Sequence, residues 1–423
     1  MDKSDSRGLK PALGLIDATA ISVGAIIGAG IYVVIGIVAG LAGPALIISM
    51  ILAAVVALFT ALSFAELSAW LPREGSVYEF SYRLISPFAG FLAGWMYMLG
   101  NAFAGAAVAL GFAFYFTELF PFASPKIVAL LLCLAFTIIN FFGIRQSAKL
   151  NDILVGAKLL ILSFFLILGL GYLRPENFHP FAPSGKGIIF GACYIFFAFG
   201  GFARVSVLAE EIEDAEHNVP KAILLSLLIS TILYLLIGTV AVGLVGASAL
   251  AASSSPLAEA IKVTRNPFAV SVISLGGLVA TASVLLTSIL GVSREAYAMA
   301  LRDALPSSLS RLHPVHGTPY LSVWISGLIM ALMVLSIDLE KVVAVSTFGL
   351  LFYYILANFS DAKLRLQGSK NLLLPILGAT SCLALLAFLL FTSPYAWALG
   401  VLVLAAGSIF YKLRNKSRNI NLR

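Results

Sequence analysis

The chain has 423 residues, of which 60% are hydrophobic and only 11% are charged, and its mean hydropathy is +1.01. Soluble domains carry about 25% charged residues, so this composition excludes a soluble globular protein and predicts an integral membrane protein. The formal net charge of +7 comes from Lys and Arg scattered between apolar segments. That pattern favours the lipid bilayer as a partner and excludes nucleic acid.

A membrane-spanning helix needs about 20 mostly apolar residues. The first apolar run is longer than the core of a signal peptide, so we expect it to be retained as a membrane helix. On this scale the sequence predicts twelve spans, at residues 12–40, 44–71, 87–118, 125–142, 148–173, 186–210, 220–245, 268–300, 319–337, 341–360, 371–392 and 394–412. The predicted fold class is therefore all-α integral membrane, with about 12 transmembrane helices.

Lys and Arg are unevenly shared between the two sides of these predicted spans. With the N-terminus inside, the outer segments hold only Lys126, Arg174, Lys186, Lys262, Arg265 and Lys341. Inner loops of membrane proteins carry an excess of Lys and Arg. The sequence therefore predicts a multi-pass protein of the cell (plasma) membrane, with both termini in the cytoplasm.

The three cysteines, Cys133, Cys193 and Cys382, lie within or near apolar spans, and the sequence has no CxxC motif or Cys/His cluster. We therefore expect no metal site, no structural disulfide and no cofactor. The HExxH and GxSxG motifs of hydrolases are absent, and so is the GxxxxGK[ST] loop of an ATP-driven pump. The sequence predicts a protein that is not an enzyme.

Glycines interrupt two of the predicted spans. Span one reads SVGAIIGAGIYVVIG, and span six reads FFAFGGFARVS with Gly200 and Gly201 adjacent. Glycine costs about 1 kcal/mol relative to Ala in a helix interior, and it lets the backbone unwind. The alternative is close helix packing, because span one also contains GxxxG spacings.

The positions of these two spans favour unwinding. They lie five helices apart, so two five-helix units enter the membrane from opposite sides, as an inverted repeat requires. Paired interrupted segments of this kind indicate a transporter's binding site near the membrane midplane. Free N–H groups at a half-helix N-terminus suit a carboxylate, and unwound carbonyl groups suit an ammonium. The sequence therefore predicts a small zwitterion as the substrate.

Five stretches of the sequence carry a family resemblance. They are GAIIGAGIY in span one, AELSAWLPREGSVYEFSY after span two, FFAFGGFARVSVLAEEIEDAEHNVPKAI across span six, SREAYAMALRDALPSSLSRLHPVHGTPY after span eight and FGLLFYYILANFSDAKLR in span ten. In this order the chain resembles an amino acid permease of the amino acid–polyamine–organocation (APC) superfamily, and in particular its proton-coupled members with a lysine in span five.

The resemblance implies a 5+5 inverted repeat with broken helices 1 and 6, two peripheral helices and transport by alternating access. The expected units are a cytoplasmic N-terminal segment (1–11), helices 1–5 (12–173), helices 6–10 (186–360), helices 11–12 (371–412) and a cytoplasmic tail (413–423). It also implies a substrate held between spans one, three, six, eight and ten.

The resemblance assigns the substrate contacts by position. Backbone groups that meet the substrate carboxylate would come from Ile27, Gly28, Ala29 and Gly30. Carbonyl groups that receive its amino group would come from the region of Phe197, Ala198 and Gly200. Phe197 or Phe199 would cover the substrate, unless both rings face lipid or the protein core.

The sequence departs from the cationic branch of this superfamily. Gly100 and Ala203 stand where that branch usually carries an acidic residue. The carboxylates Glu66, Glu118, Glu210 and Glu211 all lie near the ends of spans. These departures disfavour cationic substrates. Arg204 stands where the family usually has a small residue. It would either pair with Glu66 or Glu210 in an inner gate or extend along a water-filled vestibule.

Lys158 is the single charged residue in the apolar run 153–173. It lies about ten residues, hence about 15 Å, from the inner start of span five, which is too far for its ammonium to reach the interface. The resemblance implies that this ammonium replaces the sodium ion of sodium-coupled relatives. The acceptors of the Lys158 ammonium would be the Gly24 carbonyl and the Ser283 hydroxyl, with Thr287 as a further candidate. The alternative is a fixed structural cation that never titrates.

Together, these features predict a sodium-independent transporter of small or medium neutral L-amino acids that is coupled to protons. The alternatives are an amino acid exchanger, a carrier of cationic amino acids, polyamines or ethanolamine, and an amino acid sensor without net transport. The predicted partners are the amino acid, protons and the lipid bilayer, and the sequence specifies no oligomeric state.

Overall fold

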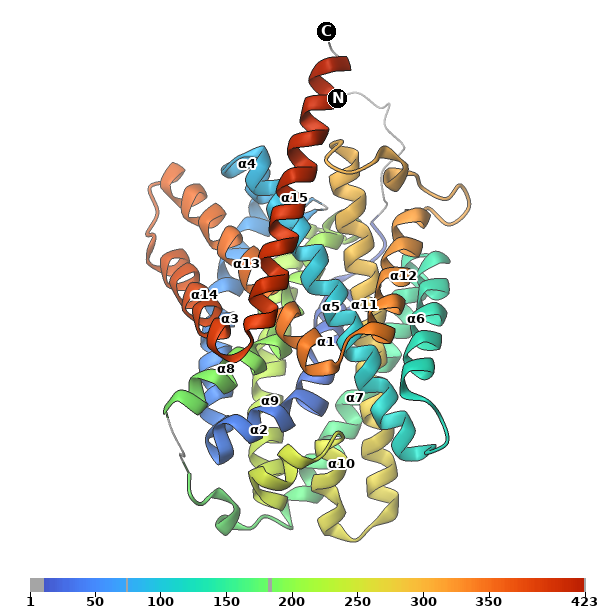
Figure 1. Cartoon of the computed structure of the whole chain (residues 1–423), viewed down its shortest axis with the longest axis vertical. Helices are drawn as coiled ribbons and strands as arrows, with labels where there is room; N and C mark the ends of the chain where they lie inside the picture. The colour runs from blue at the N-terminus through green and yellow to red at the C-terminus, as the bar shows by residue number, and fades with distance from the viewer. Residues whose placement is uncertain (1–10, 74, 182–184, 422–423) are drawn as a thin grey trace.

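The computed structural model describes residues 11–421 except 74 and 182–184. In this part of the chain it is all-helical, with one isolated parallel bridge between Leu13 and Ile212. Long helices such as α15 run lengthwise through the molecule (Figure 1). The predicted all-α class is confirmed, and most of the predicted segment 1–11 lies outside the described residues.

Both glycine-rich spans are broken. The first consists of α1 (Leu15–Ile26), the π-helical turn η1 (Gly30–Val34) and α2 (Ile35–Ala42). The sixth consists of α8 (Gly185–Phe199) and the 3₁₀ helix η4 (Phe202–Glu211). Helical hydrogen bonding therefore stops where glycine lowers the cost of leaving the helix.

The remaining spans are single helices. They are α3 (Leu46–Trp70), α5 (Pro87–Leu119), α6 (Pro125–Phe141), α7 (Ile144–Leu170), α9 (Ala215–Ala252), α11 (Pro267–Leu301), α12 (Tyr320–Ser336), α13 (Leu339–Gln367), α14 (Leu373–Thr392) and α15 (Pro394–Asn421). α9 continues beyond its predicted end at residue 245, but Gly246 (φ 77°) interrupts its helical geometry there.

Several short elements were not predicted. They are α4 (Ser76–Leu84), α10 (Pro256–Ile261), η2 (Gly43–Ala45), η3 (Pro175–Phe178), η5 (Lys262–Thr264) and η6 (Ser307–Ser310). They lie in the loops, and each is too short to meet the length expected of a membrane span. α4 and α10 lie at opposite ends of the molecule in Figure 1.

Side-chain caps fix where two central helices begin. The Ser86 hydroxyl accepts a hydrogen bond from the Ala89 N–H at 3.1 Å, and Pro87 occupies the first turn of α5. The Asn266 side chain accepts from Phe268 N at 3.0 Å, and Pro267 begins α11. A polar cap followed by proline satisfies the free N–H groups of a helix start, so both helix starts agree closely with the sequence prediction.

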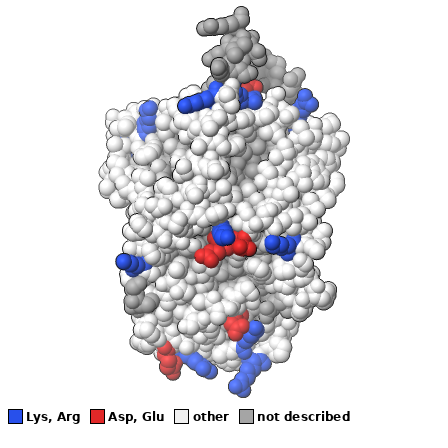
Figure 2. Space-filling model, viewed as in Figure 1, with Lys and Arg blue, Asp and Glu red and all other residues white. Residues whose placement is uncertain are grey.

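The surface agrees with a membrane location. In the described part of the chain, nine helical segments are long and apolar enough to cross a membrane, and the first of these, Leu15–Trp70, covers most of predicted spans one and two. The helices α6 and α12 are apolar but shorter. On the face drawn in Figure 2, charged side chains gather at the ends and in one band between them, and broad uncharged areas separate them. The protein is therefore a multi-pass membrane protein with about twelve spans.

The packing brings the two breaks into the middle of the bundle. α5 packs against α11 and α13, and α1 packs against α7, α9 and η4. The turn η1 packs against α8. The broken parts of spans one and six thus pack against spans five, seven, eight and ten.

Candidate functional site

The break in the first span is centred on Ile27. Its backbone is extended (φ −78°, ψ 98°), although its N–H still donates to the Val23 carbonyl at 3.0 Å. After Gly28, the chain resumes as the π-helical turn η1. Single π-helical turns are rare and frequently mark functional sites. The Ile27 carbonyl therefore leaves the helical pattern and becomes available to another group.

The break in the sixth span is the turn Gly200–Gly201. The Gly200 N–H donates to the Phe197 carbonyl at 3.2 Å, and the Arg204 N–H donates to the Gly201 carbonyl at 3.0 Å. The chain after this turn is a 3₁₀ helix of ten residues, an unusually long run for this tighter helix. The sixth span therefore changes its helical geometry beside the site.

Close contact between the two breaks requires glycine. A Cβ atom on Gly30 would overlap Ala198 of α8, and one on Gly201 would overlap the backbone of Ala25 in α1. Glycine lets one backbone approach another closely. Unwinding and close packing, which the sequence presented as alternatives, therefore occur together.

Two tyrosines that were not singled out from the sequence satisfy carbonyl groups at the breaks. The Tyr234 hydroxyl lies 2.6 Å from the Ile26 carbonyl oxygen and 3.1 Å from that of Ala198. The Tyr354 hydroxyl donates to the Gly200 carbonyl at 3.0 Å. Unpaired buried carbonyl groups are costly, so α9 and α13 stabilise the interruptions.

A cavity lies between the two breaks. Its lining comprises Ala25, Ile26, Ala29, Gly30, Asn101, Ala104, Val108, Phe197, Ala198, Gly200, Gly201, Arg204, Val284 and Leu350. These residues come from spans one, three, six, eight and ten. The remaining free volume is about 20 Å³, roughly the room of one water molecule. An amino acid therefore requires the helices to separate.

The cavity brings together some of the residues expected to bind substrate. Ala29, Gly30, Phe197, Ala198 and Gly200 line it. The remaining expected residues, Ile27, Gly28 and Phe199, are not part of this lining.

Ile27, Gly28 and Phe199 contact neighbouring helices instead of the cavity. Gly28 faces Val284 of α11, and the Ile27 carbonyl accepts a hydrogen bond from Lys158. The ring of Phe199 packs edge-on against Tyr234, with 5.2 Å between ring centroids. Phe197 is therefore the aromatic residue of this pair that can cover a ligand in the cavity.

Lys158 is fully buried. Its ammonium nitrogen lies 2.7 Å from the Ile27 carbonyl oxygen, 3.1 Å from that of Gly24 and 3.3 Å from that of Val23. It also lies 3.3 Å from the Ser283 hydroxyl of α11. All four acceptors are uncharged, and no ion pair to Lys158 occurs among the described residues.

Lys158 therefore contacts Gly24 and Ser283, and a role for these three residues in proton coupling stays a prediction. The further candidate, Thr287, is not among its acceptors. Its hydroxyl accepts from Arg204 instead, at 2.9 Å. Asn151, also not singled out from the sequence, joins the group because its side-chain oxygen accepts from Ser283 at 2.9 Å.

Arg204 is 3% exposed and lines the cavity. Its Nη2 atom donates to the Asn101 side-chain oxygen at 2.6 Å. The gate hypothesis required a carboxylate partner, Glu66 or Glu210, and neither residue is among the partners of this guanidinium. The proposed ion pairs are therefore wrong, because Arg204 points inward to spans three and eight.

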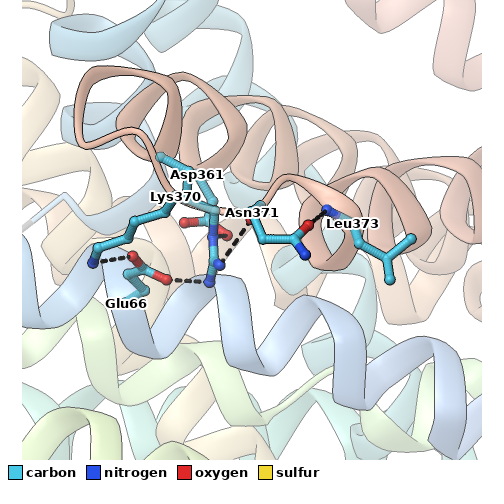
Figure 3. Close-up of polar contacts among 6 residues, drawn as sticks. Glu66, Asp361, Lys370, Asn371 and Leu373 are labelled. Atoms are coloured by element: carbon cyan, nitrogen blue, oxygen red, sulfur yellow. Dashed lines mark hydrogen bonds and ion pairs between the residues drawn. The ribbon is translucent and has the colours of Figure 1, made fainter.

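Glu66 belongs to a different cluster at the ends of α3 and α13. Figure 3 shows Lys370 and Glu66 pointing toward each other, and the ammonium lies 2.9 Å from the carboxylate. Arg365 forms an ion pair with the same carboxylate and donates to Asp361 at 3.0 Å. This cluster connects spans two and ten and lies apart from the cavity lining.

Three further ionisable groups are buried in or beside α11. Arg294 donates to the Glu211 carboxylate at 2.9 Å, and both side chains are almost fully buried. The carboxyl group of Glu295 is fully buried beside Gly94 of α5. Glu295 lies near the end of α11 and does not line the cavity.

Comparisons with known proteins agree with this architecture. The family model described as amino acid permease matches residues 13–415. The branched-chain amino acid permease BcaP of Bacillus subtilis (strain 168) is 33% identical over 383 residues, which cover 86% of this chain and 82% of that protein. The methylthioribose transporter of the same organism is 30% identical over 448 residues, covering 99% and 96%.

A mammalian relative is also similar. Cationic amino acid transporter 4 of Mus musculus is 32% identical over 391 residues, which cover 86% of this chain and 61% of that protein. The family and these relatives are transporters and not enzymes. The chain therefore belongs to the amino acid permease family of the APC superfamily.

Proposed function

We propose that the protein moves small or medium neutral L-amino acids across the cytoplasmic membrane by alternating access, coupled to protons and independent of sodium. One observation carries the choice of substrate. The two helix breaks face each other across a cavity whose described lining contains no carboxylate and one cation, Arg204. A zwitterion matches the two breaks, whereas a cationic side chain would meet an unfavourable like charge.

The proposed binding mode uses backbone groups at both breaks. The substrate carboxylate binds N–H groups near Gly28, Ala29 and Gly30, at the start of the resumed helix, where the dipole favours an anion. The amino group binds carbonyl groups near Phe197, Ala198 and Gly200. Since the Ala198 and Gly200 carbonyls already accept from tyrosines, each would use its second lone pair.

Proton coupling is proposed from Lys158. Its ammonium connects α7 to the broken α1 and to α11. Burial without a counter-charge makes a protonated lysine costly. Loss of the proton would weaken these contacts and release the three spans from one another, whereas protonation would restore them.

The relatives support the proposal unevenly. BcaP is described as a branched-chain amino acid permease, which favours a neutral substrate. Cationic amino acid transporter 4 favours the alternative carrier of cationic substrates. We prefer a neutral substrate, because the described cavity lining contains no carboxylate that could pair with a cationic side chain.

We further propose the orientation and the units of the chain. The end where α15 finishes faces the cytoplasm of the cell, together with both termini. Residues 12–173 and 186–360 form the two inverted halves, and 371–412 the peripheral pair. Cysteine substitutions in the loops at either end, labelled from outside intact cells, test this orientation.

The main test is ligand binding followed by transport. Purified protein is screened by thermal shift against the twenty amino acids and polyamines, and hits are tested by counterflow of labelled substrate in liposomes. We expect stabilisation by neutral amino acids and counterflow without sodium. Binding only by arginine, lysine, agmatine or putrescine would contradict the substrate class, and binding without counterflow would indicate a sensor.

A further inference from the structure

Arg204 differs from the other side chains around the cavity. The described lining is apolar except for Arg204 and Asn101, and these two side chains contact each other at 2.6 Å. Neither was assigned to the substrate from the sequence, since the expected contacts are backbone groups and a phenylalanine. Spans three and six thus each contribute one polar side chain to the cavity. The proposed binding of the substrate's amino and carboxylate groups uses neither of them.

The guanidinium is held by uncharged acceptors. In addition to Asn101, its Nη1 atom lies 2.9 Å from the Thr287 hydroxyl and 3.4 Å from the Val284 carbonyl oxygen. Its Nε atom has no hydrogen-bond partner among the described residues. Guanidinium carries five N–H donors, so these contacts fix its position and leave donors available.

A buried cation without a counter-charge is expensive, and within membrane segments such groups generally serve binding or transport. Arg204 forms no ion pair with a described residue, yet it lines the cavity that lies between the two breaks. An oxygen acceptor that arrives with the substrate would use the remaining donors. A second cation in this place would be repelled.

We propose that Arg204 is a specificity-determining residue that donates hydrogen bonds to an oxygen at the end of the substrate's side chain. The preferred substrates then carry a carboxamide side chain, which keeps them within the proposed class of neutral amino acids, and cationic side chains are excluded. This inference rests on the proposed function, since the α-amino and α-carboxylate groups must occupy the two breaks. The side chain would point toward α5 and α11.

Three amino acids of nearly the same shape test the inference. Leucine, asparagine and aspartate all branch at Cγ into two heavy atoms, and they differ mainly in whether those atoms accept hydrogen bonds. Affinities of the full-length protein are measured by titration for each. We expect asparagine to bind at least about tenfold more tightly than leucine, as hydrogen bonds to a charged donor are comparatively strong. Tighter binding of aspartate than of asparagine would contradict the carboxamide site and the neutral substrate class proposed above.

Substitution of the guanidinium completes the test. Arg204→Met keeps an unbranched side chain but removes the donors, and Arg204→Gln keeps one amide donor group in case the first variant folds poorly. We expect either variant to lose the preference for asparagine over leucine, so that the two affinities differ by less than about threefold. Lys126→Gln, which removes a cation at an exposed position, serves as the matched control and should leave all three affinities unchanged.

The possible failures are distinguishable. If leucine binds as tightly as asparagine, or if both Arg204 variants keep the wild-type ranking, the specificity role is overturned while the proposed transporter stands. If no amino acid binds the wild-type protein in any arm, the proposed function itself fails, and this inference fails with it.

Discussion

The ammonium nitrogen of Lys158 lies 2.7 Å from the carbonyl oxygen of Ile27, the residue at which the first span stops being helical. The same nitrogen contacts the Gly24 carbonyl and the Ser283 hydroxyl. One side chain of α7 therefore holds the broken part of α1 against α11. Any change in the charge of this group changes the contact among three spans.

Lys158→Ala tests whether this contact couples transport to protons. Uptake by the wild type should require no sodium and should depend on pH, because protonation of Lys158 is proposed to tie the spans together. The variant should lose proton-driven accumulation in liposomes. Lys149→Ala, at an exposed position on the same helix, should behave as the wild type.

Two results would show that Lys158 is not the coupling site. One is uptake that sodium stimulates in the wild type. The other is a pH profile that Lys158→Ala leaves unchanged, which would assign the lysine to the role of a fixed structural cation.

Gly28 is predicted to be needed for backbone approach to the substrate carboxylate. The added Cβ of Gly28→Ala would overlap the end of the Val284 side chain, so this variant alone mixes packing with binding. Val284→Ala removes the obstructing methyl groups, and the double variant separates the two effects. We expect the double variant to recover most of its thermal stability while amino acid affinity stays at least about tenfold reduced.

Recovery of both stability and affinity in the double variant would reassign Gly28 to helix packing. Gly30→Val is a poorer choice for this question. Its side chain would overlap Ala198 of α8, so a loss of binding would also follow from separation of the two broken spans.

Tyr234→Phe removes the hydroxyl group that lies between the two breaks. The Ile26 carbonyl oxygen, which lies 2.6 Å from this hydroxyl, then loses its donor in a buried environment, which costs about 1–3 kcal/mol. We expect a lower midpoint of thermal unfolding and weaker amino acid binding. Tyr194→Phe is the control, since its hydroxyl bonds the Glu340 side chain at 3.3 Å outside the cavity lining. If Tyr234→Phe and Tyr194→Phe have the same unfolding midpoint and the same amino acid affinity, Tyr234 does not stabilise the breaks.

The buried pair of Arg294 and Glu211 makes a prediction about stability. Removing one partner, as in Arg294→Met, leaves a buried carboxylate without its ion pair and should destabilise the protein by about 3–5 kcal/mol. Replacing both residues by methionine should lower the free energy of unfolding by less than the sum of the two single changes. Denaturant unfolding in detergent measures these free energies. Arg83→Gln serves as a control, because its pair with Glu79 is partly exposed and should contribute about 0–1 kcal/mol. If the loss in the double variant equals the sum of the losses in the two single variants, Arg294 and Glu211 are not energetically coupled.

The sequence alone predicted the spans and the two broken helices. A run of about 20 apolar residues must cross the bilayer or be buried, and this property is local, so most predicted ends lie within a few residues of those observed. The glycines of the first span and the Gly200–Gly201 pair were likewise visible, because the preference of glycine for unwound backbone is a property of the residue itself. Short elements such as α4 escaped detection because their length and mixed polarity resemble those of a loop.

Only the tertiary structure decided which polar groups meet. The Lys158 ammonium and its nearest acceptor lie 131 positions apart in the sequence, and Arg204 lies 103 positions from Asn101. Family resemblance suggested Gly24 and Ser283 for Lys158, but not Ile27 or Val23. For Arg204, the charge of Glu66 and Glu210 suggested partners that the packing does not supply.

The physical reason is that hydropathy places a helix in the membrane without fixing its rotation about its own axis. Rotation is set by side-chain packing against neighbouring helices, and it determines which residues face a cavity. Tyr234 and Tyr354 carry no local signal that distinguishes them from tyrosines facing lipid. Their role at the breaks exists only because α9 and α13 pack with those faces turned inward.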